Sequence, residues 1–204
     1  MILHGYDRSS ASYRVRIALR LKGIEREDAI LDLLRGDQLQ DAYRAINPQG
    51  LVPTLDTGKH RLTQSLAIIE YLDEVYPDPP LLSDDAVERA RIRAFGLAIA
   101  CEIHPLQNLG TLRRLRSFGL DKQQVQAWAM QVVAEGLDAC ERMAQQTAGR
   151  FAVGDRVTMA DIVLIPQLSN ARRYWSELRW ERLAAIEKCC LALDAFRSVA
   201  PTIP

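Results

Sequence analysis

The chain of 204 residues carries 26 lysine and arginine side chains and 26 aspartate and glutamate side chains, so its formal net charge is zero. This balance argues against a nucleic-acid-binding or membrane-surface protein, because no overall positive field attracts a polyanion. No apolar run reaches the roughly 18 residues of a membrane span, and the first residues read as a strand rather than a signal peptide, so we expect a cytoplasmic protein without nucleic-acid or membrane partners.

The four cysteines are expected to be reduced and structural: Cys101, Cys140, Cys189 and Cys190. They form no C-x-x-C pair and have no histidine at a spacing suited to zinc. We therefore expect no metal site and interpret them as small apolar side chains of helices.

Residues 1–46 read as strand, helix, strand, helix. The predicted elements are a strand over Ile2–Tyr6, a helix over Ala11–Lys22 that ends at Gly23, a strand over Ile24–Leu31 and a helix over Asp37–Ile46. The basic residues of the first helix are expected to remain in solvent: Arg14, Arg16, Arg20 and Lys22.

A short apolar strand from Val52 to Leu55 follows, with Pro53 at its start. A proline is tolerated there because the ladder of hydrogen bonds has not yet begun. With a cis Val52-Pro53 bond, the backbone of Val52 would be free to pair with an extended peptide. The turn over residues 56–58 then returns the chain through a hairpin to Leu62.

A helix is predicted to begin at Gln64-Ser65, with apolar residues at helical spacing from Leu66 to Val75. Its first N–H groups have no partner within the helix, and its dipole is positive at this end, so the start can bind a carboxylate. The free backbone of Val52 and this carboxylate-binding helix start lie next to each other in the predicted fold. Together they suit a small acidic peptide as the ligand.

The segment Pro77–Leu82 is predicted to be a linker, because prolines at 77, 79 and 80 interrupt helix and strand alike. After it the sequence reads as helices. Ser83, Asp84 and Asp85 can cap a long helix to about Arg116, bent or broken at His104-Pro105, and further helices follow over 121–146, from the capping box Thr158–Asp161, and near the end of the chain. The expected division is an α/β domain over 1–78, a linker over 79–84 and an all-helical domain over 85–204.

Five segments together resemble the zeta class of glutathione transferases, the family of maleylacetoacetate isomerases and bacterial maleylpyruvate isomerases. They are Arg8–Leu19, Gln64–Leu72, Pro105–Asn108, Gly154-Asp155 with Thr158–Asp161, and Pro166-Gln167 with Asn170–Arg173. The resemblance implies a thioredoxin-like N-terminal domain with a cis proline and an all-helical C-terminal domain. It also implies a homodimer that uses glutathione. Ala11 departs from the family, which usually has cysteine there, so a mechanism that needs a protein thiol at this position is ruled out.

The resemblance assigns catalysis to Arg8, Ser9 and Ser10. A hydroxyl at Ser9, on the turn that begins the first helix, can donate to a thiolate while the helix N-terminus adds positive potential. Glutathione contacts are implied for Ser9, Ser10, Ala11, Ser12, Gln38, Val52, Pro53, Gln64, Ser65, His104 and Asn108. Substrate binding is implied for Arg8, His104 and Arg173, and helical spacing leaves open whether Arg172 or Arg173 points into the site.

The implied reaction is the isomerisation of maleylacetoacetate to fumarylacetoacetate by reversible thiolate addition, in the catabolism of aromatic amino acids and related compounds. The substrate would be a small diacid. Maleylpyruvate is an alternative substrate, and conjugation or dehalogenation of small α-halo acids is an alternative reaction. A non-catalytic transferase-like module is a third reading, against which Ser9, Val52-Pro53 and Gln64-Ser65 argue.

Overall fold

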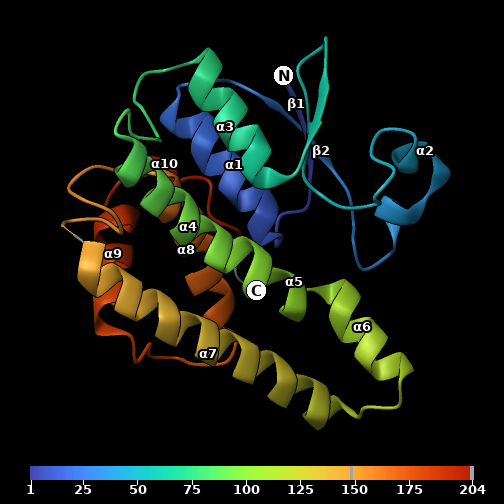
Figure 1. Cartoon of the computed structure of the whole chain (residues 1–204). Coiled ribbons are helices and arrows are strands. Elements are labelled where there is room, and N and C mark those ends of the chain that lie inside the picture. The colour runs from blue at the N-terminus through green and yellow to red at the C-terminus, as the bar shows by residue number, and fades with distance from the viewer. Residues whose placement is uncertain (148, 203–204) are drawn as a thin grey trace. The chain divides into compact units, whose positions relative to one another are not determined.

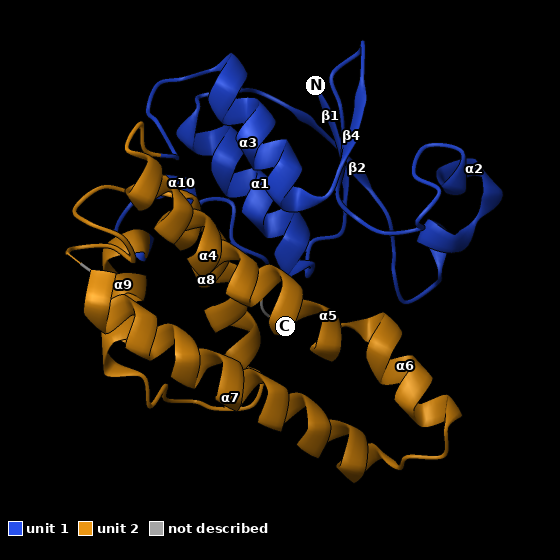
Figure 2. Ribbon diagram, viewed as in Figure 1, with its two compact units in different colours: residues 1–82, 191–204 blue, residues 83–190 orange. Residues whose placement is uncertain are grey.

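The structure, a computed structural model, describes residues 1–147 and 149–202, which divide into two compact units (Figure 2). Unit 1 comprises residues 1–82 together with the segment that begins at Leu191, and unit 2 comprises residues 83–190. The chain passes from unit 1 to unit 2 between Leu82 and Ser83.

Unit 1 is built on a four-stranded sheet in the order β2-β1-β3-β4. The strands are β1 (Ile2–Gly5), β2 (Glu27–Ile30), β3 (Thr54–Asp56) and β4 (Arg61–Thr63). β1 is parallel to β2 and antiparallel to β3, and β3 and β4 form a hairpin. Helices α1 (Ser10–Leu21) and α3 (Ser65–Val75) lie side by side on one face of this sheet (Figure 1). Alternate strand residues such as Leu3 and Leu55 are buried, as period-two burial requires.

Helix α1 has a defined signal at each end. The side-chain oxygen of Ser9 accepts the N–H of Ser12 at 3.2 Å and so caps its start. Gly23 has φ +64°, and the following N–H, of Ile24, bonds back to the carbonyl of Leu19 at 2.9 Å, which closes the other end.

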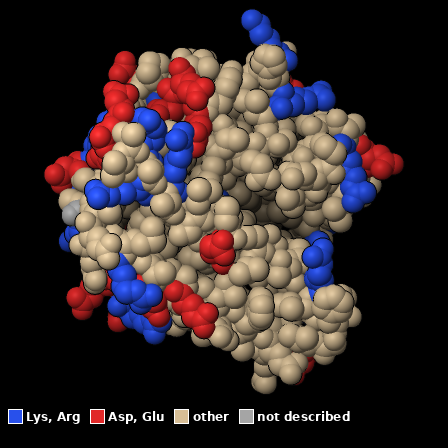
Figure 3. Space-filling model, in the orientation of Figure 1, with Lys and Arg blue, Asp and Glu red and all other residues tan. Residues whose placement is uncertain are grey.

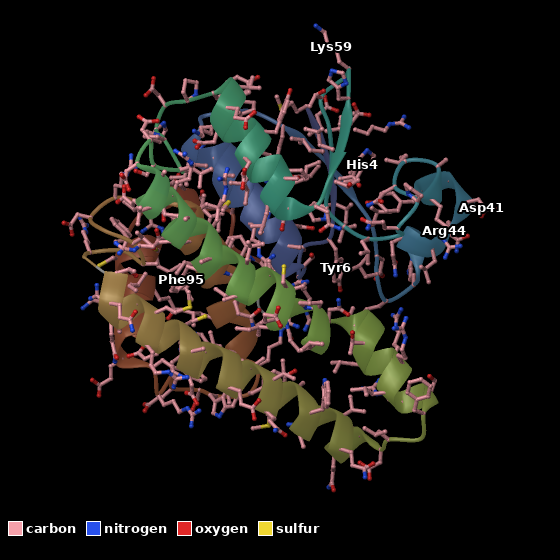
Figure 4. The ribbon with its side chains drawn as sticks, viewed as in Figure 1. His4, Tyr6, Asp41, Arg44, Lys59 and Phe95 are labelled. Atoms are coloured by element: carbon pink, nitrogen blue, oxygen red, sulfur yellow. The ribbon has the colours of Figure 1, made fainter. Side chains whose placement is uncertain are left out.

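The helix expected over Asp37–Ile46 is wrong as a single element. The structure has a 3₁₀ turn η1 (Asp37–Leu39) and one helical turn α2 (Asp41–Arg44), because Gln40 between them is extended, with ψ 147°. Tyr43 anchors the segment by donating its hydroxyl to the Leu51 carbonyl at 2.7 Å. Asp41 and Arg44 point away from the sheet (Figure 4).

The expectation that the basic residues of α1 lie in solvent is wrong for Arg14 and Arg16, which are only 2% and 8% exposed. Their partners come from distant parts of the chain. Arg14 donates to the hydroxyl of Ser65, and Arg16 donates to the carbonyl of Val199. Lys22 also buries its side chain, against Asp73, whereas Arg20 is exposed.

Unit 2 contains α4 (Ala86–Glu102), α5 (His104–Gln107), α6 (Leu109–Ser117), α7 (Lys122–Thr147), α8 (Met159–Ala171) and all but the last residue of α9 (Glu181–Leu191). Helix α8 is apolar nearly all round and buried, and it packs on α4. The long helix expected to reach Arg116 is broken twice, at Ile103 before Pro105 and again at Asn108, which caps α6. No helix in the described ranges combines the length and apolar character needed to cross a membrane.

The segment after Leu191 groups with unit 1, although the sequence suggests that it belongs to the helical domain. It contains the short helix α10 (Asp194–Arg197), whose Phe196 is fully buried. The Phe196 carbonyl accepts the hydroxyl of Tyr13 at 2.7 Å, and Asp194 pairs with Arg20 at 2.7 Å. These contacts attach the segment to α1.

Candidate active site

One end of the sheet in unit 1 brings three of the expected site segments together. Thr54, the first residue of β3, pairs with His4 on β1 and with Thr63, the last residue of β4. Thus β1 ends, β3 begins and β4 ends at the same end of the sheet. The segment around Ser9 follows β1, Val52-Pro53 precedes β3, and Gln64-Ser65 follows β4, so all three segments lie at this end.

The expected cis bond between Val52 and Pro53 is confirmed. Sheet pairing begins at Thr54, so the backbone of Val52 lies outside the ladder formed by β1, β3 and β4. An extended peptide can therefore pair with Val52 without displacing a strand.

The start of α3 is open and electropositive. Gln64 has φ +66°, unusual for a residue other than glycine, and its amide nitrogen donates to Gln49 at 2.9 Å. Within the described residues no side chain caps this helix start. Beneath it, the buried guanidinium of Arg14 donates from Nη1 to Ser65 Oγ at 3.3 Å. The helix dipole and this cation both favour a carboxylate at Ser65, which fits the carboxylate of glutathione.

The start of α1 can offer a hydroxyl donor. Ser9 uses its oxygen to accept the Ser12 N–H, so its own hydroxyl proton remains available to a thiolate. Ser10 is 6% exposed and Ser12 fully buried, with the Ser12 oxygen accepting the N–H of Tyr6 at 3.4 Å. Tyr6 lies beside this end of α1 (Figure 4). Ser9 is therefore the more accessible of the two serines expected to act in catalysis, and the side chain of Ala11 has no polar atom.

Gln38 lies in η1, 8% exposed, and its amide oxygen has no hydrogen-bond partner in the described parts of the chain. The Gln38 carbonyl approaches Gly50 so closely that a Cβ added there would lie 2.9 Å from it, and Gly50 has φ +63°. This close approach shows that Gln38 lies next to the loop that leads to Val52-Pro53. A buried amide oxygen in this position can accept an N–H from a bound peptide. Neither Gly50 nor Gln49 is predicted from the sequence to lie at the site, although Pro48 and Gly50 mark this turn.

The site residues expected in unit 2 lie at helix ends. His104 begins α5 and is half-buried, and Asn108 caps α6 by accepting the Thr111 N–H at 3.0 Å, which leaves its amide nitrogen to donate. Arg173 is exposed in the turn after α8, as is Arg8 in the turn after β1.

The adjacent arginines of this turn have different environments. Arg172 forms a two-point ion pair with Glu187, with Nε 3.2 Å from Oε1 and Nη2 bonded to Oε2, and this hydrogen bond raises the pKa of Arg172. Its Nη1 also donates to the carbonyl of Ser176 at 3.3 Å. Arg172 is thus held by groups of its own unit. In residues 1–147 and 149–202 no three acidic, histidine or cysteine side chains gather as a metal site would need.

Both halves of the chain match known families. Residues 3–80 match "Glutathione S-transferase, N-terminal domain" and residues 84–188 match "Glutathione S-transferase, C-terminal domain". A maleylacetoacetate isomerase from Pseudomonas aeruginosa is 44% identical over 98% of this chain and 96% of its own length.

Solved structures of similar fold support the same family. A holo structure of maleyl pyruvate isomerase, described as a bacterial glutathione S-transferase in the zeta class, has a TM-score of 0.95 and 43% identity, covering 98% of this chain and 97% of its own. A maleylacetoacetate isomerase from Methylobacterium extorquens, with bound malonate and glutathione, has a TM-score of 0.94 and 37% identity, covering 98% and 96%. With both domain families matched in order, the expected thioredoxin-like domain followed by an all-helical domain is confirmed, and the chain belongs to the glutathione S-transferase family, in its zeta class.

Proposed function

We propose that the protein is a glutathione-dependent cis–trans isomerase that converts maleylacetoacetate to fumarylacetoacetate. The observation that carries this proposal is the gathering of Ser9, cis Val52-Pro53 and the open start of α3 at one end of the sheet. The similarity over the whole chain to isomerases of this kind supports it.

Bound glutathione would supply a thiolate that adds reversibly to the cis double bond, allows it to rotate and leaves unchanged. The residues of the chain make that thiolate available at neutral pH. A cysteine thiol has a pKa of about 8.5, and each unit of lowering corresponds to ~1.4 kcal/mol. The Ser9 hydroxyl and the start of α1 favour the ionised form, while Val52 and Ser65 hold the peptide and its carboxylate.

The full set of residues proposed to contact glutathione is Ser9, Ser10, Ala11, Ser12, Gln38, Val52, Pro53, Gln64, Ser65, His104 and Asn108. Arg8, His104 and Arg173 are proposed to bind the diacid. Guanidinium groups bind carboxylates at two points and stabilise negative charge that develops on a nearby oxygen. Holding both anionic ends leaves the central bond of the substrate free to turn.

Maleylpyruvate is the second candidate substrate. The similarity to maleyl pyruvate isomerase and the histidine at position 104 favour it. We further propose a cytoplasmic homodimer that acts in the catabolism of aromatic compounds. Transferase or dehalogenase activity on small α-halo acids would use the same thiolate.

The decisive experiment supplies the purified protein with maleylacetoacetate, maleylpyruvate or an α-halo acid, each with and without glutathione. We expect isomerisation of a maleyl substrate that depends on glutathione and does not consume it. Turnover limited to halide release would replace isomerisation with displacement. No uptake of glutathione by folded protein in calorimetry would overturn the proposal.

The Ser9→Ala variant tests the role of the hydroxyl. We expect turnover to fall at least about tenfold, corresponding to ~1.4 kcal/mol or more, with little change in glutathione affinity. Ser117→Ala is a matched control, because Ser117 is exposed and, among the residues that the structure describes, its hydroxyl donates to the Arg114 carbonyl alone. Turnover equal to that of the unmodified protein would remove Ser9 from the mechanism.

A further inference from the structure

Arg16 is a buried arginine on α1 that donates only to backbone carbonyls in the hydrogen bonds of the described residues. Its Nη2 donates to Asp7 at 2.9 Å, its Nε to Val199 at 3.0 Å, and its Nη1 lies 3.5 Å from the Tyr6 carbonyl, at the limit of hydrogen bonding. Its guanidinium also lies over the ring of Tyr13, 5.5 Å from the centroid. An arginine keeps its charge and is costly to bury unless its N–H groups find acceptors. The three backbone carbonyls supply those acceptors to Arg16.

Two of the three carbonyls that Arg16 holds, those of Tyr6 and Asp7, belong to the turn that leads to Ser9. The Tyr6 carbonyl accepts the N–H of Ser9 at 3.0 Å as well as the Nη1 of Arg16. Asp7, the next residue, is held through its carbonyl by Arg16 and through its carboxylate by the N–H of Thr202 at 3.0 Å. Thus the position of the Ser9 backbone depends on contacts made two and three residues before it, at Asp7 and Tyr6.

The other side of these contacts is the segment of residues 194–202, here named the C-terminal strap. Arg16 reaches it at Val199, Tyr13 donates to its Phe196 carbonyl at 2.7 Å, and Thr202 reaches back to Asp7. We propose that the C-terminal strap, through Arg16, positions the turn that carries Ser9 and so sets how well the Ser9 hydroxyl stabilises the glutathione thiolate. This inference rests on the proposed function.

The physical reason is that a hydroxyl stabilises a thiolate only when its donor distance and direction are correct, and small displacements are expensive in catalysis. Ser9 fixes its own rotamer by accepting from Ser12, but that bond only orients the side chain relative to α1. Arg16 fixes the preceding turn. Arg16 is therefore a positioning residue, and it touches neither glutathione nor substrate.

The test compares Arg16→Gln with Arg20→Gln. Arg20 lies on the same helix and pairs with Asp194 of the same strap, but at an exposed site away from the turn. The readout is the pKa of the bound glutathione thiol, followed by the ultraviolet absorbance of the thiolate as the pH is raised. We expect this pKa to rise by about one unit in Arg16→Gln, with kcat at neutral pH falling by up to about tenfold, as the thiolate fraction falls, and recovering at higher pH. Arg20→Gln should match the unmodified protein.

Binding of S-methylglutathione, which has no thiol to ionise, separates positioning from general damage. Its dissociation constant should change less than about twofold in Arg16→Gln, because Val52 and Ser65 hold the peptide. If Arg16→Gln fails to fold, Tyr13→Phe removes only the hydroxyl that holds the Phe196 carbonyl and should raise the thiol pKa by a smaller amount.

The inference is overturned if folded Arg16→Gln leaves the thiol pKa and the pH profile of kcat unchanged. The same result with Tyr13→Phe overturns it where Arg16→Gln does not fold. If the proposed function itself is wrong, the unmodified protein will show no ultraviolet absorbance from a bound glutathione thiolate, which distinguishes the two failures.

Discussion

Ala11 is the second residue of α1, at the position where the zeta-class motif usually has cysteine. The four cysteine thiols of this chain therefore lie outside that motif. Burial raises the pKa of the Cys140 thiol to about 12, and it raises that of Cys190 as well. Both thiols therefore remain protonated and unreactive at neutral pH. Cys101 is the exposed one.

We predict that alkylation with iodoacetamide at neutral pH modifies Cys101 and leaves Cys140 and Cys190 intact, without loss of isomerase activity. Mass spectrometry of the modified protein and an activity assay on the same sample check this. Loss of turnover in proportion to labelling at one cysteine would give that thiol a role that the structure does not assign.

Arg172 and Arg173 are expected to respond differently to the same substitution. Arg172→Ala should lower the free energy of unfolding by about 1–3 kcal/mol, because it removes the partner of the buried carboxylate of Glu187. Arg173→Ala, at an exposed site, should change stability by less than about 0.5 kcal/mol but weaken activity on the diacid. Urea unfolding and steady-state kinetics on both variants test the pair. Unchanged kinetics for Arg173→Ala would move the diacid-binding role to another residue.

Residue-level prediction from sequence worked where the signal is local. Pro53 before an apolar strand and Ser9 before a helix could both be interpreted without tertiary structure. The burial of Arg14 and Arg16 could not be, because their partners, Ser65 and Val199, lie far along the chain. For the same reason the sequence indicates a carboxylate seat at Ser65 but not the cation beneath it.

At the scale of elements, the capping box that begins α8 is the clearest case of sequence determining local structure. Both oxygens of Asp161 accept hydrogen bonds: Oδ1 from the N–H of Ala152 at 2.8 Å, and Oδ2 from the N–H and hydroxyl of Thr158 at 2.9 and 3.1 Å. The sequence predicts the Thr158 contacts. The bond to Ala152 is a tertiary contact that the sequence does not reveal, and through it Asp161 also ties the preceding loop to α8.

Burial raises the pKa of Asp161 to about 6, from an ordinary value of 3.8. The folded state therefore binds this proton more tightly than the unfolded state. Its contribution to stability is fully present below about pH 3.8 and is lost as the pH rises through about 6. We predict that the free energy of unfolding, measured relative to Asp161→Asn, falls between pH 4 and pH 6 and is level at higher pH.

Urea unfolding of both proteins across this pH range measures the difference. The variant itself should be less stable by about 1–3 kcal/mol, because an amide presents a donor where two acceptors are needed. A difference that rises with pH in this range would show that the hydrogen bonds to the carboxylate outweigh its burial.

The helix predicted over Asp37–Ile46 failed for an identifiable reason. Gly36, before η1, is left-handed, with φ +85°, and Gln40, between η1 and α2, is extended, so the segment does not continue as one helix. Tyr43 then determines the path of the segment by its bond to Leu51. Residues whose path is determined by such tertiary contacts show no hydrophobic periodicity in the sequence. Helix α8, by contrast, can be predicted from its continuous apolar sequence.

At the scale of the whole molecule, opposite charges are mixed on the face drawn in Figure 3. With 26 charges of each sign, the chain has no net field to attract or repel a dianionic substrate. A diacid would then have to be recognised by individual groups of the site, for which Arg8 and Arg173 are proposed, rather than by the net charge of the protein.

Glutathione should stabilise the folded protein because it binds only the native state. At a free concentration of about 100 times its dissociation constant, the expected gain is ~2.7 kcal/mol, and the melting temperature should rise by several degrees. Thermal unfolding with glutathione and with cysteinylglycine, which lacks the γ-glutamyl carboxylate, checks this. Equal shifts for both compounds would argue against the carboxylate seat at Ser65.

The segment that completes unit 1 is encoded after all of unit 2. A growing polypeptide therefore cannot place Phe196 against Tyr13, or Val199 against Arg16, until the helical unit has left the ribosome. A fragment that stops at Leu82 lacks these contacts. When residues 1–82 are expressed alone, the backbone amides of α1 should be less protected from hydrogen exchange. Adding residues 191–204 as a separate peptide should restore that protection.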